Sequence, residues 1–417
     1  MRFSLSGYLK NISFPKHWSI TKNYTLTSIP VYRPMQSQNI PCEQLNIITK
    51  IHPCSNPSHK FSFSLICVLE GCPLLLTMTV LIWCLSWNPT AATERAERFF
   101  ENGTAFWAIA EGPLAGRVAW AFDRPGNESD PKNLLLSRIA TSQQIEWASY
   151  KPTHKDIVET LTSHLGASGA FDGNYCTSIC SQVFDDTPNV KPIMLDVYKP
   201  NRKRKWFVMH HKFVVLRSKQ GDGVLTGSFN WTERATDLNF ENLIYVKSTK
   251  LANAYSKVFR KLPTRLSLEV ADGYFSAGFN DAGIELIKRS IAAAQKRILV
   301  AVWSISVASK RYPNPIYDAL AKAVDRGVEV QVITDYHKAK KRKYQKLAVH
   351  SVRMRSKKAH MHHKYMVIDD LYVVSGSYNF VTKSVLGNHE NVVVIKSPAM
   401  ASSFSNQWNK MRNYKKP

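Results

Sequence analysis

A histidine and a lysine separated by one residue occur twice in the chain, in matching surroundings. His210 and Lys212 recur 152 residues later as His362 and Lys364. Each pair is followed, at a constant offset of 149 residues, by Gly-Ser-aromatic-Asn and then by Asn-x-Glu-Asn, which together contain Ser228, Asn230, Glu241, Ser377, Asn379 and Glu390. Residues two apart in a strand point to the same side. Each copy therefore presents an imidazole beside an ammonium group, and the repetition in register indicates a function.

These side chains suit chemistry on a phosphodiester. If the two halves associate about a pseudo-twofold axis, both imidazoles meet across one cleft. A neutral imidazole can attack phosphorus to give a phosphohistidine, while a protonated imidazole supplies the leaving alkoxide with a proton and later activates water. The catalytic candidates are His210, Lys212, Asn230, His362, Lys364 and Asn379. The supporting candidates are Ser228, Ser377, Glu241 and Glu390, the two glutamates as residues that orient an imidazole.

Helices and strands in alternation must position these residues. In the second half the pattern predicts helices over 282–295, 316–326 and 401–413, and strands over 298–304, 328–334, 364–368, 372–375 and 391–395. Such alternation is typical of α/β layers. The repeat divides the chain into an N-terminal extension, 1–93, and two halves, 94–262 and 263–417. We expect two similar α/β/α halves with one shared active-site cleft.

The motifs resemble those of the phospholipase D superfamily, whose signature is His-x-Lys-x4-Asp followed by Gly-Ser-x-Asn. His362, Lys364 and Asp369 match the complete signature, whereas Arg217 occupies the Asp position of the first half. The resemblance covers roughly 122–395 and is nearest, in its motifs, to the nuclease and cardiolipin-hydrolase branch. It implies two phospholipase D-like halves, a metal-independent phosphodiesterase that needs no cofactor, a supporting role for Asp369, and a complete site within one chain.

Arg217 leaves a different interpretation open. A scaffold that binds nucleic acid and has lost its activity is one alternative. Both His-x-Lys pairs are intact, however, whereas a decayed copy usually loses its histidine or lysine. The sequence therefore favours an enzyme.

The charge of the chain indicates a polyanionic substrate. Lys and Arg number 56 against 31 Asp and Glu, a net charge of +25, which attracts phosphate-bearing molecules. Two basic runs with neighbouring aromatic residues supply the substrate-binding candidates Lys203, Arg204, Lys205, Lys341 and Arg342. Such runs favour nucleic acid, whose single strands offer phosphates and stackable bases. They can equally dock an anionic membrane, which would make the protein a phospholipase D or cardiolipin hydrolase.

The N-terminal extension contains an apolar stretch without charged residues, at about 71–90. A signal peptide or membrane anchor there would place the protein outside the cytoplasm or on a membrane, and a buried hairpin or helix is the alternative. Residues 1–60 show neither helical nor strand periodicity and are expected to be poorly ordered. The composition, 44% hydrophobic and 21% charged, excludes wholesale disorder.

We expect no metal site. Cys176 and Cys180 have no second cysteine pair to complete a zinc tetrahedron. His362 and His363 face opposite sides of a strand and cannot easily chelate together, and no acidic cluster suits magnesium.

Overall fold

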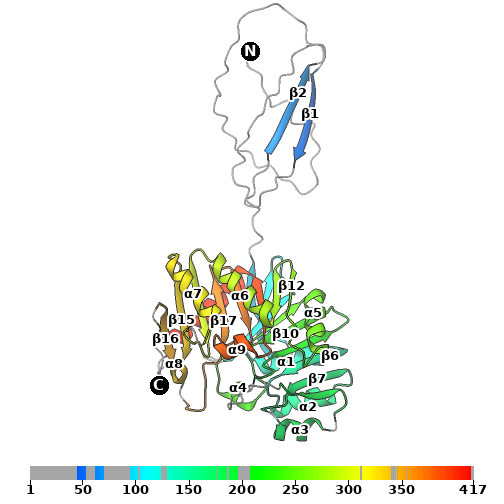
Figure 1. Ribbon diagram of the computed structural model, residues 1–417. Coiled ribbons are helices and arrows are strands. Elements are labelled where there is room, and N and C mark those ends of the chain that lie inside the picture. Colours follow the sequence, from blue (N-terminus) through cyan, green and yellow to red (C-terminus); the bar gives the residue numbers. More distant parts are fainter. Residues whose placement is uncertain are drawn as a thin grey trace, which may run out of the picture. The chain divides into compact units, whose positions relative to one another are not determined.

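The structure is a computed structural model that describes residues 45–52, 62–69, 94–101, 104–123, 129–175, 177–185, 187–195, 207–309, 312–339, 344, 346–354 and 356–414. The chain divides into two units, Met1–Trp87 and Asn88–Pro417. In the first, β1 (Leu45–His52) pairs with β2 (Ser62–Leu69) as an antiparallel hairpin (Figure 1). The expectation of no regular structure in 1–60 is therefore wrong for β1. The apolar stretch at 71–90 lies outside the described residues.

The first sheet of the second unit carries the first His-x-Lys pair. Its described strands number nine, in the order β3 (Arg95–Glu101), β4 (Thr104–Glu111), β5 (Val118–Asp123), β11 (Glu241–Lys247), β10 (Gly223–Gly227), β9 (Lys212–Arg217), β6 (Gln144–Ser149), β7 (Ala167–Asp172) and β8 (Val190–Ile193). The strands β6, β7 and β8 are parallel to one another, and β9 runs antiparallel to β6.

The second sheet repeats this arrangement around the second pair. Eight described strands follow the order β12 (Leu268–Asp272), β13 (Phe275–Phe279), β19 (Asn391–Lys396), β18 (Tyr372–Gly376), β17 (Lys364–Ile368), β14 (Arg297–Val302), β15 (Glu329–Asp335) and β16 (Ala348–Val352). Here β14, β15 and β16 are parallel, and β17 runs antiparallel to β14.

Both His-x-Lys pairs lie at the same kind of sheet edge. Lys212 at the start of β9 lies opposite Ser149 at the end of β6, and Lys364 at the start of β17 lies opposite Val302 at the end of β14. We call this edge the histidine edge: it consists of the carboxyl ends of β6–β8 and β14–β16 and the segments that adjoin them. In α/β sheets, ligands bind outside the carboxyl ends of the parallel strands.

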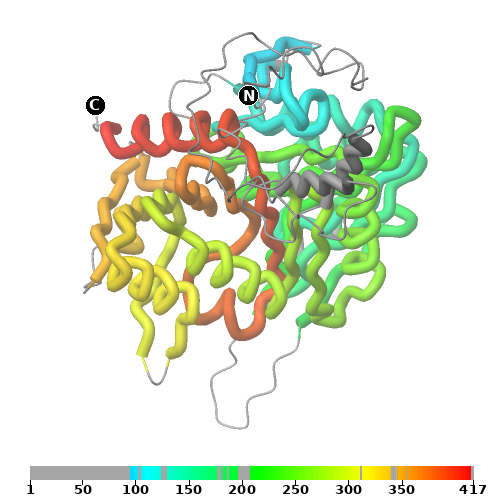
Figure 2. The backbone as a smooth tube through the Cα atoms, turned by 90° about the horizontal axis from the view of Figure 1, so that it is seen from above, coloured from blue at the N-terminus to red at the C-terminus, as the bar shows by residue number. Residues whose placement is uncertain are grey.

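Helices cover the sheets and fill the space between them. They are α1 (Pro131–Ala140), α2 (Lys155–Ser163), α3 (Thr177–Phe184), α4 (Glu233–Asp237), α5 (Thr249–Arg260), α6 (Asn280–Ala293), α7 (Pro315–Asp325), α8 (Tyr336–Ala339), α9 (Thr382–Leu386) and α10 (Pro398–Arg412). Figure 2 shows the first half, cyan to green, beside the second half, yellow to red.

One hydrophobic core joins the two halves. It contains residues of both sheets, among them Phe213 and Tyr365, and residues of α5 and α10, among them Tyr255 and Trp408. Two further cores lie within the individual halves. Close packing of this kind leaves little freedom for the strands that carry the histidines.

The helices and strands expected in the second half are confirmed, with boundaries within three residues of those observed. The α/β class and the repetition of one layered half are confirmed as well. Within the part of the chain that the structure describes, no helix has both the length and the apolar character needed to cross a bilayer.

Candidate active site

The two His-x-Lys segments are bound to each other's halves through the backbone. The N–H of His210 donates to the carbonyl of His389 at 3.0 Å, and the N–H of His362 donates to the carbonyl of Phe240 at 3.0 Å. The residues before the histidines, Met209 and Met361, form β-bridges to the opposite half. Each His-x-Lys segment is therefore held by the other half of the chain.

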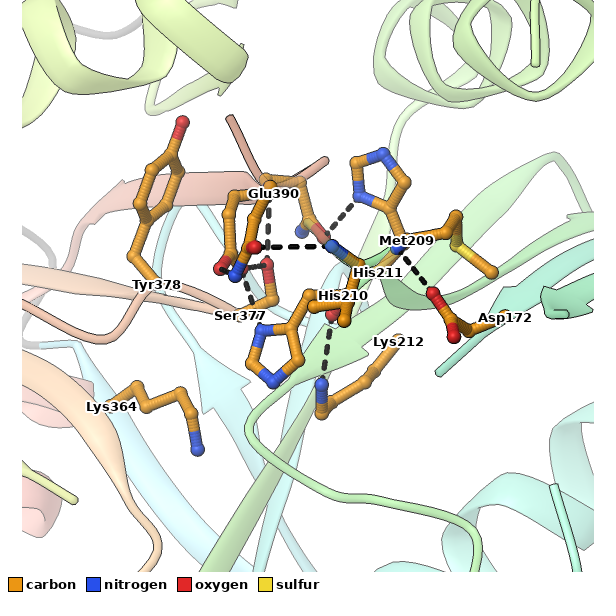
Figure 3. Close-up of polar contacts among 12 residues, drawn as sticks. Asp172, Met209, His210, His211, Lys212, Lys364, Ser377, Tyr378 and Glu390 are labelled. Atoms are coloured by element: carbon orange, nitrogen blue, oxygen red, sulfur yellow. Dashed lines mark hydrogen bonds and ion pairs between the residues drawn. The ribbon is translucent and has the colours of Figure 1, made fainter. Parts of the chain in front are cut away.

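Each imidazole is also paired with a glutamate of the opposite half. His210 Nδ1 lies 2.9 Å from Glu390 Oε2 (Figure 3). His362 Nδ1 lies 2.7 Å from Glu241 Oε1. Ser377 and Ser228 hold the glutamates in turn: each serine hydroxyl donates to the glutamate of its own half, at 2.5 and 2.7 Å. The sequence predicted that the glutamates orient imidazoles but not that the pairs cross between the halves.

The lysines are buried beside the histidines. Lys212 Nζ donates to the carbonyl of His210 at 2.8 Å, and Lys364 Nζ donates to the carbonyl of His362 at 2.7 Å. Lys364 Nζ also lies 3.1 Å from both ring nitrogens of His362. Figure 3 shows the ammonium groups of Lys212 and Lys364 on either side of His210. Two cations thus adjoin the imidazoles, where a phosphoryl group would need them.

An aromatic ring lies against each imidazole. The centre of the Tyr150 ring is 5.2 Å from that of His210, and the centre of the Trp303 ring is 5.3 Å from that of His362. Both follow the end of the strand next to the catalytic one, β6 or β14. They limit solvent access to the histidines, of which only 7% is exposed in each case.

Burial dominates the protonation of these groups. It lowers the pKa of His210 to about 4, although the charge of Glu390 opposes this, and it lowers the pKa of His362 well below its usual value. Burial also lowers the pKa of Lys212 to about 8 and that of Lys364 to about 7. Both imidazoles are therefore neutral at pH 7, and a bound anion favours the charged lysines.

The two glutamates differ in protonation. Burial raises the pKa of Glu241 to about 8, with Lys364 opposing. Burial acts in the same direction on Glu390, but the contact with His210, the charge of Lys212 and the hydrogen bond from Ser377 outweigh it and keep the pKa of Glu390 below the usual value. At neutral pH Glu390 is ionised, whereas Glu241 is mostly protonated. The two crossed pairs are thus similar in geometry and different in electrostatics.

The histidine that follows each His-x-Lys histidine connects the two halves. His211 Nδ1 lies 3.2 Å from Asn391 Oδ1, and His363 Nδ1 lies 3.3 Å from Asn242 Oδ1. The amide of Asn242 donates to Ser375 across the halves. Sequence reasoning missed this role, although the doubled histidine and the last Asn of Asn-x-Glu-Asn recur in both copies.

A buried aspartate fixes the start of each His-x-Lys segment. Asp172 Oδ2 accepts the N–H of Met209 at 2.7 Å, and Asp335 Oδ2 accepts the N–H of Met361 at 3.1 Å. They end β7 and β15, and at most 1% of either is exposed. Sequence reasoning missed both aspartates. A carboxylate at the carboxyl end of an apolar parallel strand was the available signal.

Comparison with known families decides which family the chain belongs to. The family described as "Cardiolipin synthase, PLD-like domain" matches residues 174–262 and 287–412, just over half of the chain. The chain belongs to this family. Each matched part contains one His-x-Lys pair, so both halves are PLD-like.

Individual proteins resemble parts of this PLD-like chain. A mitochondrial cardiolipin hydrolase from Chlamydomonas reinhardtii is 33% identical over 103 residues, which are 24% of this chain and 46% of that protein. A phospholipase D from Rickettsia prowazekii (strain Madrid E) is 28% identical over 176 residues, 40% of this chain and 80% of that protein. The chain thus matches less than half of the length of the first of these relatives.

A solved structure supports the fold of the PLD-like body. The crystal structure of a phosphatidylserine synthase from Haemophilus influenzae Rd KW20 has a TM-score of 0.50 at 12% identity and covers 68% of this chain and 84% of that one. At this identity the similarity concerns the fold alone.

The Asp position of the PLD-like signature lies away from the histidines. Asp369 follows the far end of β17, and its carboxylate accepts the backbone N–H groups of Gln295, Lys296 and Arg297 at 2.8–3.0 Å. Arg217 ends β9 in the first half and pairs with Asp222 at 2.6 Å. At about 3.4 Å per residue, Arg217 is about 17 Å along the strand from Lys212. The replacement of the signature Asp by Arg217 in the first half therefore lies away from both histidines.

The remaining candidates differ in what the structure says of them. Asn230 and Asn379 follow β10 and β18, and their buried Oδ1 atoms have no hydrogen-bond partner among the described residues. The substrate-binding candidates Lys203, Arg204, Lys205, Lys341 and Arg342 lie outside the described residues.

Cys180 is disulfide-bonded. In the described ranges no group of three or more His, Cys, Asp or Glu is arranged to hold a metal ion.

Proposed function

We propose that the chain is a phosphodiesterase that needs no metal ion, forms a phosphohistidine, and acts on the headgroup bond of anionic phospholipids. The observation that carries this proposal is the crossed pairing of His210 with Glu390 and of His362 with Glu241. Each glutamate engages Nδ1 and leaves Nε2 for the reaction. Two such imidazoles flanked by two lysines are what an in-line displacement at phosphorus requires.

The reaction has two steps, formation of the phosphohistidine and its hydrolysis. In the first, the lone pair of one Nε2 bonds to phosphorus and the bond from phosphorus to the leaving oxygen breaks. The other imidazole, which takes up a proton from solvent when the anionic phosphodiester binds beside it, gives this proton to the leaving oxygen. In the second, the same imidazole, now neutral, takes a proton from water. The water oxygen then bonds to phosphorus as the bond from phosphorus to histidine breaks.

The general acid, the lysines and the asparagines around the phosphorus supply part of the rate enhancement. A positioned general acid contributes about 10² to 10⁴ in rate, and one donor to a developing oxyanion contributes about 3 to 4 kcal/mol. Lys212, Lys364, Asn230 and Asn379 are the candidate donors. Buried to 98% or more, the two lysines act in a medium where their charge is weakly screened.

The names of the relatives support a phospholipid substrate, since proteins similar to this chain in sequence are called cardiolipin hydrolase and phospholipase D. Single-stranded nucleic acid is a second candidate. The basic runs with aromatic neighbours and the net charge of +25 favour it.

The test offers both substrates to the purified full chain with EDTA present. Phosphatidylcholine vesicles containing cardiolipin and labelled single-stranded DNA are compared, with His362→Ala as control. We expect release of the lipid headgroup, and its loss in His362→Ala. Cleavage of DNA alone would replace the lipid with the second candidate, and inactivity on both substrates, or activity only with added metal, would refute the proposal.

A further inference from the structure

Four large apolar side chains are exposed in segments that adjoin the histidine edge. Tyr175, Met194, Tyr312 and Leu386 are 48%, 49%, 43% and 54% exposed. They are four of the nine most exposed large apolar residues in the described part of the chain. Exposed apolar groups that gather at one place mark an interaction surface, whereas scattered ones need no explanation.

The topology puts all four at the histidine edge. Tyr175 and Met194 come directly after β7 and β8, Tyr312 lies in the connection from β14 to α7, and Leu386 ends α9, after β18. Tyr175 is linked to the site through its neighbour: its ring centre is 5.9 Å from that of Tyr150, which contacts His210. Figure 1 shows α3, α4 and α9 on the lower side of this unit.

Basic side chains accompany the apolar ones. Lys383 Nζ lies 5.5 Å from the centre of the Tyr175 ring, and Lys338 Nζ lies 4.1 Å from the centre of the Trp303 ring. Other cations in segments of this edge include Lys151, Lys155, Arg234, Arg353, Lys357 and Lys358, and the exposed carboxylates there include Asp156, Glu233, Asp237 and Asp318. Cations beside exposed aromatic and aliphatic groups match a surface that is apolar inside and anionic outside.

We infer that the histidine edge is an interfacial docking surface that seats the enzyme on a bilayer containing anionic phospholipid. This inference rests on the proposed function and adds how the substrate is reached. The apolar side chains enter the boundary between headgroups and acyl chains, to a depth of about 5–10 Å for interfacial groups. The lysines remain at the level of the phosphates. The nearly buried histidines then meet a phosphodiester that stays in the membrane.

The side-chain types distinguish this partner from nucleic acid. A track for single strands uses aromatic faces on which bases stack. Met194 and Leu386 have no such face, yet they are the most exposed of the four. Their exposure is explained by insertion among acyl chains, where burial of apolar surface is favourable.

The test uses the full chain with the double substitution Met194→Asp and Leu386→Asp. Two rates are measured: hydrolysis of phosphatidylcholine vesicles containing cardiolipin, and hydrolysis of a soluble p-nitrophenyl phosphodiester. The matched control is Leu165→Asp, because Leu165 is fully exposed but precedes β7, at the opposite edge. We expect the ratio of vesicle rate to soluble rate to fall at least about tenfold in the double variant and to stay within about twofold in Leu165→Asp.

The outcomes separate this inference from the proposed function. If the unmodified chain hydrolyses neither the vesicles nor the soluble phosphodiester, the proposed function is refuted. An unchanged ratio in the double variant, or an equal fall in Leu165→Asp, would refute the docking surface while leaving the enzyme intact. A loss of single-stranded DNA binding in the double variant without loss of vesicle turnover would assign the edge to nucleic acid and overturn the inference.

Discussion

Each imidazole of the site depends on a carboxylate from the other half, and the two carboxylates differ in charge. Ionised Glu390 accepts the Nδ1–H of His210, which leaves the lone pair of Nε2 for attack. Glu241, with its pKa raised to about 8 by burial, is mostly protonated at pH 7, so its O–H donates a hydrogen bond to Nδ1 of His362. His362 then carries hydrogen on Nε2. We therefore expect His210 to be the nucleophile and His362 the proton donor.

The difference between the glutamates predicts unequal effects of substitution. Glu390→Gln removes a full charge at pH 7 and should lower kcat about 10²-fold, whereas Glu241→Gln removes little charge and should lower kcat less than tenfold. At pH 9, above the pKa of Glu241, the deficit of Glu241→Gln should grow. Measurement of kcat for both variants at pH 7 and pH 9 checks this, and equal deficits at both pH values would contradict it.

Asp172 predicts a kinetic effect through His210. In Asp172→Asn the amide can accept only one of the two N–H groups, of Met209 and Tyr175, that the carboxylate accepts. The start of the His210 segment should shift, and kcat should fall about 10- to 100-fold with KM within about threefold. Asp130→Asn is the control, since Asp130 caps α1 by accepting the N–H of Asn133. An unchanged kcat in Asp172→Asn, or an equal loss in the control, would contradict the role.

At the scale of elements, Asp369 supports a turn rather than the reaction. Its carboxylate accepts three backbone N–H groups between α6 and β14. Asp369→Ala should lower the free energy of unfolding by about 1–2 kcal/mol, as loss of a helix cap does, and leave kcat nearly unchanged. Urea unfolding together with steady-state kinetics measures both. A large fall in kcat with full stability would show that the residue acts on the site.

The elements of the second half could be predicted because their apolar runs are long and bounded by turn residues. The strand β17 was predicted residue for residue, since Lys364–Ile368 belongs to the repeat. The strand β13 was missed because its sequence, Phe-Ser-Ala-Gly-Phe, has little strand character. Position 278 needs glycine because β13 packs closely against α6: a Cβ there would lie 2.7 Å from the Cα of Gly283. Such a requirement is invisible in a local pattern.

The residues of the candidate site that belong to the repeated motifs could be predicted. The pairing of each histidine with a glutamate of the other half could not. The registered motifs identified both histidines, both lysines and both glutamates. Which half supplies the partner of each imidazole depends on how the sheets face each other, and the shared core decides this. Asp172 and Asp335 were missed because they precede the motifs by 38 and 27 residues in unequal spacing, so no repeat reveals them.

At the scale of the whole molecule, buried histidines predict sensitivity to acid. Burial lowers the pKa of His211 and His363 to about 3 and that of His389 to about 4. In the unfolded chain these groups take up protons below about pH 6.5, but the folded chain does not. Stability is therefore present above pH 6.5 and is lost as the pH falls toward 4, by roughly 2 kcal/mol for each histidine at pH 5.

Urea unfolding at pH 7.5 and pH 5 measures this loss. Glu241 acts in the opposite direction, because its raised pKa makes the folded chain bind an extra proton between about pH 8 and pH 4.5. The stability lost through the three histidines exceeds the stability gained through Glu241. The urea concentration at the midpoint of unfolding should therefore be lower at pH 5 than at pH 7.5. A midpoint that is equal or higher at pH 5 would contradict neutral burial of these histidines.

The most direct test of the account is a burst measurement with a p-nitrophenyl phosphodiester, whose leaving group needs no proton. The full chain, His362→Ala and His210→Ala are mixed with this substrate in EDTA, and the protein mass is recorded after the burst. The account predicts turnover in the unmodified chain, one equivalent of p-nitrophenolate and a covalent adduct on His210 in His362→Ala, and neither in His210→Ala. Continued turnover in either variant, or the absence of an adduct in both, would contradict a phosphohistidine mechanism.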